Sequence, residues 1–328
     1  MTARGALVTG GAGFIGSHTC HALLDAGWSV IALDNFDPFY DRRLKESGVA
    51  PLRQRAGFTL VEGDVRDGAL LARLLPDVDV VVHLAARAGV RPSIAQPVAY
   101  VSINVDGTVA VLDACRERGI RRFVFGSSSS VYGDDTAVPF REDSAATHPL
   151  SPYAATKRAG ELLCQTYAHL FGMRIAVLRL FTVYGPRQRP DLAIHRFTSR
   201  LAAGQAITRF GDGSSERDYT HVDDIVQGVR RAVEWTEPPE AACEIFNLGE
   251  SRTVALDRLI ALISAALGVT AVVERADQQP GDVKRTFADI SKARQVLGYE
   301  PRVTIEEGVP RFVQWYRNAY GHQPHSAA

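Results

Sequence analysis

The 328-residue chain has no net charge, few cysteines and no long apolar run, and each absence excludes a class of protein. Lys plus Arg and Asp plus Glu number 37 each, so no overall field attracts nucleic acid or an anionic membrane. The four cysteines lie far apart without a CxxC pair, which predicts reduced thiols rather than a metal site or disulfides. No apolar run reaches the ~20 residues of a membrane span, and the N-terminus lacks the pattern of a signal peptide. We therefore expect a cytoplasmic protein with no metal, nucleic-acid or membrane partner.

The first half of the chain alternates apolar strands with helices. Strands are predicted at residues 6–9, 28–33, 58–62, 78–84, 123–125 and 174–180, and helices at 16–26, 103–118 and 153–171. Continuously apolar strands separated by helices indicate a parallel sheet that is covered on both faces. The predicted fold class is α/β: a Rossmann-type doubly wound parallel sheet with a smaller C-terminal substrate-binding lobe.

After Leu180 the pattern loosens. The stretch 182–217 is rich in Gly, Pro and Arg, and we expect it to supply binding surface rather than sheet, with one helix near 192–203. Further on, 221–234 and 256–267 are predicted as helices, 244–248 as a strand, 278–285 as a polar turn and the tail from Gly321 as frayed. The expected division is a dinucleotide-binding domain of residues 1–180, to which 218–250 return, and a lobe of 181–217 and 251–328.

A glycine-rich turn joins the first predicted strand to the first helix. Gly10, Gly13 and Gly16 fall three residues apart, and Phe14 and Ile15 lie between the last two. Glycine permits the tight turn and lets the backbone approach a pyrophosphate, while the helix N-terminus offers free N–H groups to the phosphates. The turn therefore predicts a dinucleotide site.

An acidic residue follows each of the next two strands. Asp34 ends the second strand, where a carboxylate can accept hydrogen bonds from both ribose hydroxyls and would repel a 2′-phosphate. Asp64 follows the third strand and could reach the adenine amino group. The sequence thus favours NAD over NADP.

Tyr153 and Lys157 lie one helical turn apart, so both side chains share one helix face. An ammonium beside the phenol favours phenolate, which predicts a lowered tyrosine pKa and a general base. Upstream, a run of serines from Ser127 to Ser130 follows a strand, where a parallel sheet places its site. We expect Ser128 to hydrogen-bond the reacting oxygen.

Together these motifs resemble the extended short-chain dehydrogenases, which include NAD-dependent nucleotide-sugar epimerases, dehydratases and decarboxylases. The resemblance rests on TGGAGFIG (9–16), HLAA (83–86), SSSSVYG (127–133), SPYAATK (151–157) and RDYTHVDD (217–224). It implies tightly held NAD, a UDP-sugar substrate and a homodimer that pairs through the helices 103–118 and 153–171. The catalytic residues carried over are Ser128, Tyr153, Lys157 and Ser129. The implied cofactor contacts are Gly10, Gly13, Phe14, Ile15, Gly16, Asp34, Asn35, Asp64, Val65, Leu84, Ala85, Ala86, Asn104, Tyr153 and Lys157.

The residues after Ser128 distinguish the reactions of this family. Related dehydratases carry an Asp-Glu pair just after the catalytic Ser or Thr, and related decarboxylases carry a Glu before VYG. Here those positions hold Ser129 and Ser130, neither of which can act as an acid at neutral pH. The sequence therefore favours epimerisation at sugar carbon 4, in which a 4-keto intermediate turns over and is reduced from its other face.

Within the epimerases, the chain resembles the UDP-glucuronate 4-epimerases. The acidic, aromatic loop 34–41 matches theirs, and Thr182 stands where galactose epimerases usually carry Asn. A carboxylate needs donors, and Thr182, the serines and Arg189 could supply them. The implied substrate contacts are Gly89, Arg91, Ser129, Ser130, Thr182, Arg187, Arg189, Arg217, Asp282 and Arg285.

Several alternatives stay open at this point. The first is a UDP-glucose or UDP-N-acetylglucosamine 4-epimerase that uses the same residues on a neutral sugar. The second is a UDP-glucuronate decarboxylase. A net oxidoreductase that releases NADH and a protein that senses NAD without turnover are further possibilities, and the intact Ser128, Tyr153 and Lys157 argue against the last.

Overall fold

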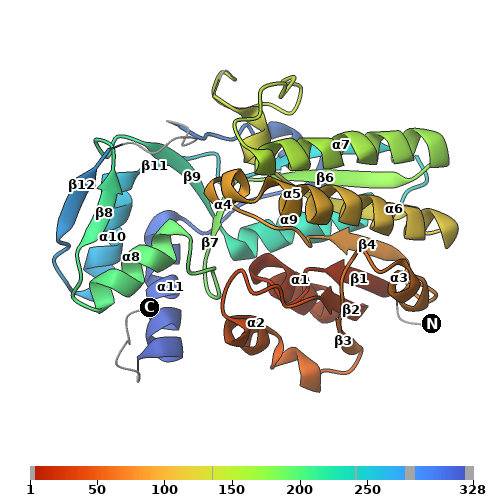
Figure 1. Ribbon diagram of the computed structural model, residues 1–328, viewed down its shortest axis with the longest axis horizontal. Coiled ribbons are helices and arrows are strands. Elements are labelled where there is room, and N and C mark those ends of the chain that lie inside the picture. The colour runs from red at the N-terminus through yellow and green to blue at the C-terminus, as the bar shows by residue number, and fades with distance from the viewer. Residues whose placement is uncertain (1–3, 135, 241, 278–284, 322–328) are drawn as a thin grey trace.

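Within residues 4–134, 136–240, 242–277 and 285–321, which the computed structural model describes, seven parallel strands form a central sheet (Figure 1). They are β1 (Gly5–Thr9), β2 (Ser29–Asp34), β3 (Phe58–Glu62), β4 (Val80–His83), β5 (Arg122–Ser128), β6 (Arg174–Leu180) and β10 (Cys243–Leu248). Their order, β10-β6-β5-β4-β1-β2-β3, reverses between β1 and β4. At such a reversal a crevice opens at the carboxyl ends of the strands. The predicted Rossmann-type sheet is confirmed.

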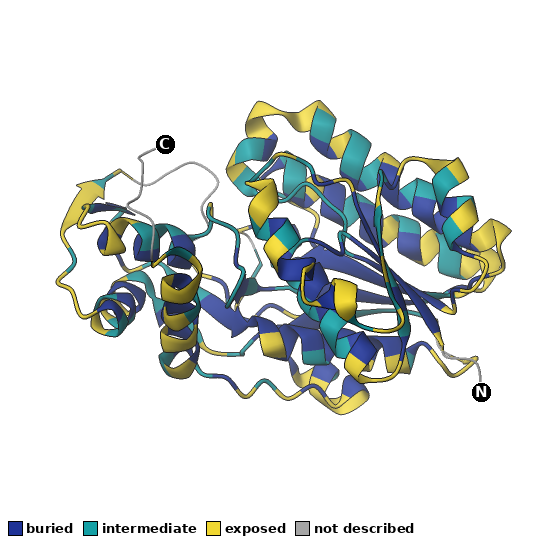
Figure 2. Ribbon diagram, turned by 90° about the horizontal axis from the view of Figure 1, so that it is seen from below, coloured by how far each residue is buried: buried dark blue, intermediate teal, exposed yellow. Residues whose placement is uncertain are grey.

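Helices cover both faces of this sheet. On one face α1 (Phe14–Asp25) packs against α9 (Val222–Trp235), and on the other α3 (Gly68–Leu74), α6 (Gly107–Glu117) and α7 (Pro152–Phe171) form a second layer. Figure 2 shows the strands buried between helices whose outer faces are exposed. Every residue of β1 and β4 is buried, as the uniformly apolar sequence requires.

The helix predicted at 103–118 begins earlier than expected. The helical stretch runs from α5 (Pro97–Val101) through a π-helical turn, η2 (Ser102–Asp106), into α6. Proline at the first helical position is compatible with a helix start because its missing N–H has no intrahelical partner there. Of the described residues, this stretch alone is long and apolar enough to cross a membrane, with a mean hydropathy of 1.3. It packs against α7 in the helical layer.

The smaller lobe is built from elements after Leu180. Its strands are β7 (Thr182–Tyr184), β8 (Ile207–Phe210), β9 (Glu216–His221), β11 (Thr253–Ala255) and β12 (Val273–Ala276), and its helices are α8 (Ala193–Ala202), α10 (Leu256–Leu267) and α11 (Ile305–Tyr320). They form the sheets β11-β9-β7 and β12-β8, and the helices share a separate core with β9. The expectation that 182–217 carries no sheet was wrong, because β7, β8 and the start of β9 fall inside it.

Several short elements complete the described chain. They are α2 (Arg42–Val49), α4 (Val90–Ala95) and the single-turn segments η1 (Leu52–Gln54), η3 (Ser129–Tyr132) and η4 (Ala293–Leu297). The predicted polar turn at 278–285, apart from Arg285, and the tail after Gly321 lie outside the described residues.

His83 ends β4 and connects the sheet to the helical layer. Its Nδ1 lies 2.7 Å from the Thr9 hydroxyl of β1, and its Nε2 lies 3.1 Å from the Thr108 hydroxyl of α6. Burial, with the positive charge of Lys157, lowers the pKa of His83 from 6.5 to about 3. An unfolded chain takes up this proton near pH 6.5, so acid favours unfolding. The stabilising contribution of neutral His83 is present above pH 6.5 and is lost as the pH falls towards 3.

Replacing His83 should therefore make stability less sensitive to acid. We expect the difference in unfolding free energy between the wild type and His83→Gln to shrink by about 2 kcal/mol between pH 6.5 and pH 5. Urea unfolding of both proteins at several pH values measures this difference. If the difference in unfolding free energy between the two proteins stays constant over this pH range, His83 is not buried and neutral in the folded state.

Candidate active site

A cavity of about 500 Å³ opens at the carboxyl ends of β1, β2, β4, β5 and β6. Its size is that of a typical small-molecule site. Most of the predicted site residues line it: Gly10, Gly13, Phe14, Ile15, Gly16, Asp34, Asn35, Asp64, Val65, Leu84, Ala85, Ala86, Gly89, Ser128, Ser129, Ser130, Tyr153, Lys157, Thr182 and Arg189. No cluster of three His, Cys, Asp or Glu that could hold a metal ion occurs in the described part of the chain.

The glycine turn forms the floor at one end of this cavity. The Gly13 N–H donates to the Gly10 carbonyl at 3.0 Å, and Gly10 has a φ of +67°, which favours glycine. A Cβ on Gly16 would lie 2.0 Å from the Gly10 carbonyl oxygen, so the helix can approach the strand only without it. No side chain caps the N-terminus of α1. Its N–H groups fit the pyrophosphate of a dinucleotide.

Asp34 occupies the end of β2 and is held by several donors. It accepts hydrogen bonds from the backbone N–H of Ala12 at 3.1 Å and of Phe36 at 2.8 Å, and it forms an ion pair with Lys45 at 3.2 Å. Both charged side chains are buried, with exposed fractions of 5% and 8%. Lys45 also lines the cavity and was not anticipated, since its contact with Asp34 depends on how α2 folds back on β2. The fixed carboxylate fits the ribose of an adenosine.

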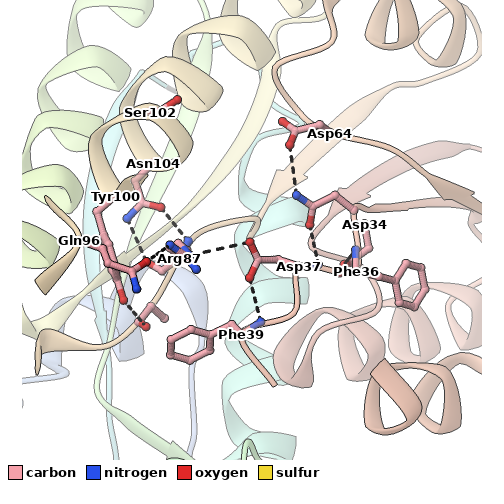
Figure 3. Close-up of polar contacts among 12 residues, drawn as sticks. Asp34, Phe36, Asp37, Phe39, Asp64, Arg87, Gln96, Tyr100, Ser102 and Asn104 are labelled. Atoms are coloured by element: carbon pink, nitrogen blue, oxygen red, sulfur yellow. Dashed lines mark hydrogen bonds and ion pairs between the residues drawn. The ribbon is translucent and has the colours of Figure 1, made fainter. Parts of the chain in front are cut away.

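Asn35 and Asp64 lie side by side at the same end (Figure 3). The Asn35 amide donates to the Asp64 carboxylate at 3.1 Å, and Arg66 binds the same carboxylate. The hydrogen bonds from Arg66 outweigh burial and lower the pKa of Asp64 to about 2. Asp64 is therefore ionised at neutral pH and can accept a hydrogen bond from the adenine side of a dinucleotide.

Ser128, Tyr153 and Lys157 meet at the opposite end. The Lys157 ammonium donates to the Gly126 carbonyl at 2.7 Å, and burial lowers its pKa to about 8 while the charge of Glu161 opposes that shift. Burial raises the pKa of Tyr153, whereas a hydrogen bond with Ser128 and the charge of Arg189 lower it. This differs from the expected lowering by Lys157, because here the desolvation of the phenol outweighs the charges around it.

A buried cluster of charged side chains lies behind Ser127 and Ser128. Glu161, one turn beyond Lys157 on α7, accepts hydrogen bonds from the Ser127 hydroxyl at 2.6 Å and from two nitrogens of Arg179 at 2.9 and 2.8 Å. Arg158 contributes a further ion pair at 2.9 Å. Because Glu161 and Arg179 are 0% and 1% exposed, these contacts connect α7 rigidly to β5 and β6.

The reacting end continues into the smaller lobe. A neighbouring cavity of about 140 Å³ shares Ser129, Ser130 and Thr182 with the larger one and is also lined by the predicted Arg217. Arg189 lines the larger cavity, where it pairs with Asp191 at 2.8 Å and lies over the Phe39 ring. Hydroxyls and arginines therefore surround the space beyond Tyr153.

Asn104 was predicted to contact the cofactor, but it does not line the cavity. Its side-chain oxygen accepts from the Arg87 N–H at 2.8 Å, and its amide donates to the Arg87 carbonyl at 3.0 Å and to the Thr156 hydroxyl at 3.0 Å. The two hydrogen bonds to Arg87 fix the loop after β4, and the third connects Asn104 to α7. Asn104 is thus a positioning residue.

Three arginines expected at the substrate also lie elsewhere. Arg187 has a φ of +68° and turns away from the cavity to contact His18 and the Gly48 carbonyl. Arg91 lies over the Phe210 ring, and Arg285 pairs with Glu216 at 2.8 Å. None of the three lines either cavity. Asp282 lies outside the described residues.

Several lining residues were missed by sequence reasoning. The loop after β2 contributes Asp37, Phe39 and Tyr40, and the loop after β4 contributes Arg87. The acidic, aromatic composition of the first loop signalled a functional surface without identifying which side chains face inward.

Comparison with known proteins shows which protein family this chain matches. Residues 6–249 match the model of the NAD dependent epimerase/dehydratase family. The chain is 40% identical over 312 residues to a UDP-glucuronate 4-epimerase of Thermodesulfobacterium geofontis, covering 94% of this chain and 95% of that protein.

Solved structures show the same likeness. A UDP-glucuronic acid 4-epimerase from Bacillus cereus, in complex with UDP-glucuronic acid and NAD, superposes with a TM-score of 0.91 at 37% identity, covering 97% of this chain and 100% of that one. A UDP-N-acetylglucosamine 4-epimerase from Methanobrevibacter ruminantium, in complex with UDP-N-acetylmuramic acid, superposes with a TM-score of 0.89 at 31% identity, covering 97% and 100%.

The buried cluster behind Ser128 predicts a specific pattern of stability. Arg179→Met should lower the unfolding free energy by about 3–5 kcal/mol, because it leaves the Glu161 carboxylate buried without its main partner. Arg158→Met, which removes a more exposed partner, should cost less. Denaturant unfolding measures both.

The double variant Arg179→Met/Glu161→Met provides the control. It should be more stable than Arg179→Met alone, since no uncompensated charge then remains in the core. A double variant less stable than the single one would contradict this account.

Proposed function

Because this chain belongs to the NAD-dependent epimerase/dehydratase family, we propose that it converts UDP-glucuronate to UDP-galacturonate by epimerisation at carbon 4. One observation carries the choice of reaction. Among the described lining residues the carboxylates are Asp34, Asp37 and Asp64, all of which follow β2 or β3. Among the described lining residues, no carboxylate therefore accompanies Tyr153 in its part of the cavity to drive elimination or decarboxylation.

The cofactor is NAD, held across the reversal of the strand order. The Gly10–Gly16 turn binds its pyrophosphate, and Asp34 binds the adenosine ribose while excluding a 2′-phosphate. Bound there, NAD would supply the hydride acceptor and donor for sugar carbon 4.

The protein's own groups manage one proton. Tyr153, as phenolate, removes the proton from the hydroxyl on carbon 4 and returns it after the sugar turns over. Ser128 hydrogen-bonds the same oxygen, and Lys157 supplies the positive charge that stabilises the phenolate. Burial raises the pKa of Tyr153, and the hydrogen bond with Ser128 and the charge of Arg189 lower it, so the proposed contribution of Lys157 adds to theirs.

The proposed acidic sugar explains the remaining lining groups. Ser129, Ser130, Thr182 and Arg189 provide hydroxyl and guanidinium donors for the carboxylate of glucuronate. The intermediate is a 4-keto acid, which loses carbon dioxide when its carboxylate stands perpendicular to the ketone. Donors that fix the carboxylate in another plane suppress that loss, and Arg217, at the neighbouring cavity, binds the UDP diphosphate.

We further propose that the protein forms a homodimer through the α6 and α7 layer. Exposed apolar side chains occur on α7 (Leu162, Leu170 and Phe171) and on α5, which packs against it (Val98 and Val101). A cytoplasmic setting is supported by the four cysteines, which form no disulfide. We also propose that residues 1–180 with 218–250 bind NAD, and that 181–217 and 251–328 bind the nucleotide sugar.

The reaction can be tested by following the products with NMR. Purified protein incubated with UDP-glucuronate should give UDP-galacturonate without UDP-xylose, and Tyr153→Phe should reduce turnover about 10²–10⁴-fold while NAD remains bound. Parallel incubation with UDP-glucose and UDP-N-acetylglucosamine tests the neutral-sugar alternative. Turnover of only a neutral sugar, or formation of UDP-xylose, would refute the proposed substrate or reaction.

Arg189 tests the recognition of the carboxylate. Arg189→Met should raise KM for UDP-glucuronate about 10–100-fold, because it removes a charge-assisted hydrogen bond. The KM for UDP-glucose should change much less, since that sugar has no carboxylate, whereas loss of the Arg189 charge that lowers the pKa of Tyr153 affects kcat for both sugars. Arg187→Met is the matched control, because Arg187 carries the same charge but does not line the cavity. An equal rise in KM for both sugars would show that Arg189 does not bind the carboxylate.

A further inference from the structure

Two loops that border the cofactor end of the cavity are joined by an ion pair. Asp37 lies in the loop after β2 and Arg87 in the loop after β4, and both line the cavity. The Arg87 Nε lies 3.8 Å from an Asp37 carboxylate oxygen. Figure 3 shows the guanidinium between Asp37 on one side and Gln96 on the other. The pair thus connects loops that arise from strands on opposite sides of β1.

The arginine projects from a loop with a fixed backbone. Asn104 binds both the N–H and the carbonyl of Arg87, and the Tyr100 hydroxyl donates to the Ala88 carbonyl at 2.9 Å. The guanidinium also donates to the Gln96 side chain at 2.6 Å. These contacts keep Arg87 pointed towards Asp37 at little further entropic cost.

Asp37 is fixed in the same way. Its N–H donates to the Asn35 side chain at 3.0 Å, and its carboxylate accepts from the Phe39 N–H at 2.9 Å. Asn35 in turn donates to Asp64 after β3. A continuous chain of polar contacts therefore runs along the rim from Asp64 to Arg87.

The ion pair between Arg87 and Asp37 is longer than a hydrogen bond. The Arg87 Nε is buried and has no hydrogen-bond partner among the described residues. A hydrogen bond to Asp37 would require the two groups to approach by less than ~1 Å. Both side chains are largely buried, with exposed fractions of 19% and 25%, so the pair is only weakly screened by solvent.

We propose that Asp37 and Arg87 form a strap across the cofactor end of the cavity, which tightens over bound NAD and slows its release. The inference rests on the assignment of this cavity to NAD. An epimerase regenerates its cofactor in every turnover, so retention between turnovers is compatible with its chemistry. The strap makes Asp37 and Arg87 positioning residues for the cofactor.

The variant Asp37→Asn distinguishes the effect of losing the strap from the effect of removing a negative charge near the NAD phosphates. NAD carries two phosphates, so removal of a nearby negative charge would by itself slow NAD release or leave it unchanged. The strap predicts the opposite sign: release about tenfold faster than in the wild type. The measurement loads purified protein with radiolabelled NAD, adds excess unlabelled NAD and follows the label that stays bound.

Two further variants complete the experiment. Arg87→Gln should also release NAD about tenfold faster, and the exchange Asp37→Arg/Arg87→Asp should bring the rate closer to the wild type than either single variant does. Arg42→Gln is the control: Arg42 pairs with Glu62 beside the same loop but does not line the cavity, and its release rate should stay within about twofold of the wild type.

The outcomes distinguish the strap from the cofactor assignment. Wild-type protein that takes up no NAD would overturn the assignment and the strap with it. Wild-type retention of NAD with unchanged or slower release in Asp37→Asn would overturn the strap alone. Melting temperatures of the NAD-free variants show whether each is folded.

Discussion

The buried ammonium of Lys157, bonded to the carbonyl of Gly126, sets the register of α7 on β5. Tyr153 lies one turn before Lys157 on the same helix face, and Ser128 follows Gly126 on the same strand. A single contact therefore determines how far the phenol stands from the serine hydroxyl. One turn further along, Glu161 binds Ser127 and repeats the connection between helix and strand. Tyr153, Lys157 and Glu161, spaced four residues apart on α7, thus include both the proposed catalytic side chains and the carboxylate that holds the helix against β5.

The site uses buried charge at both of its ends. Glu161 with Arg179 lies behind the serine, and Asp34 with Lys45 lies beside the adenosine end. Such pairs contribute little net stability, because desolvation of two charges offsets most of their attraction. Their value is positional, since a buried carboxylate that must satisfy several donors can occupy only one place. Between these two ends, the loops after β2 and β4 are held by hydrogen bonds along the rim of the cavity.

The sequence was sufficient wherever function depends on local spacing. The glycine turn and the Tyr153–Lys157 pair are read along a few residues, and the apolar strands reveal the parallel sheet. It failed where a side chain's direction depends on distant parts of the chain. Arg187 turns towards His18 through a positive φ, and the β7 and β8 strands exist only through their partners in space. The helix α11 was overlooked although its capping box, Thr304 with Glu307, is visible in the sequence.

The distribution of charge along the cavity accounts for the choice between related reactions. The described lining carboxylates lie at the proposed adenosine end, where they can accept hydrogen bonds from hydroxyl and amino groups. At the reacting end the lining groups are hydroxyls, a phenol, an ammonium and a guanidinium. We propose that such donors hold an anionic sugar and stabilise the phenolate, and none of the described residues lining this end is a carboxylate that could remove a second proton. A 4-keto intermediate bound there has one productive path, which is rotation and reduction from its other face.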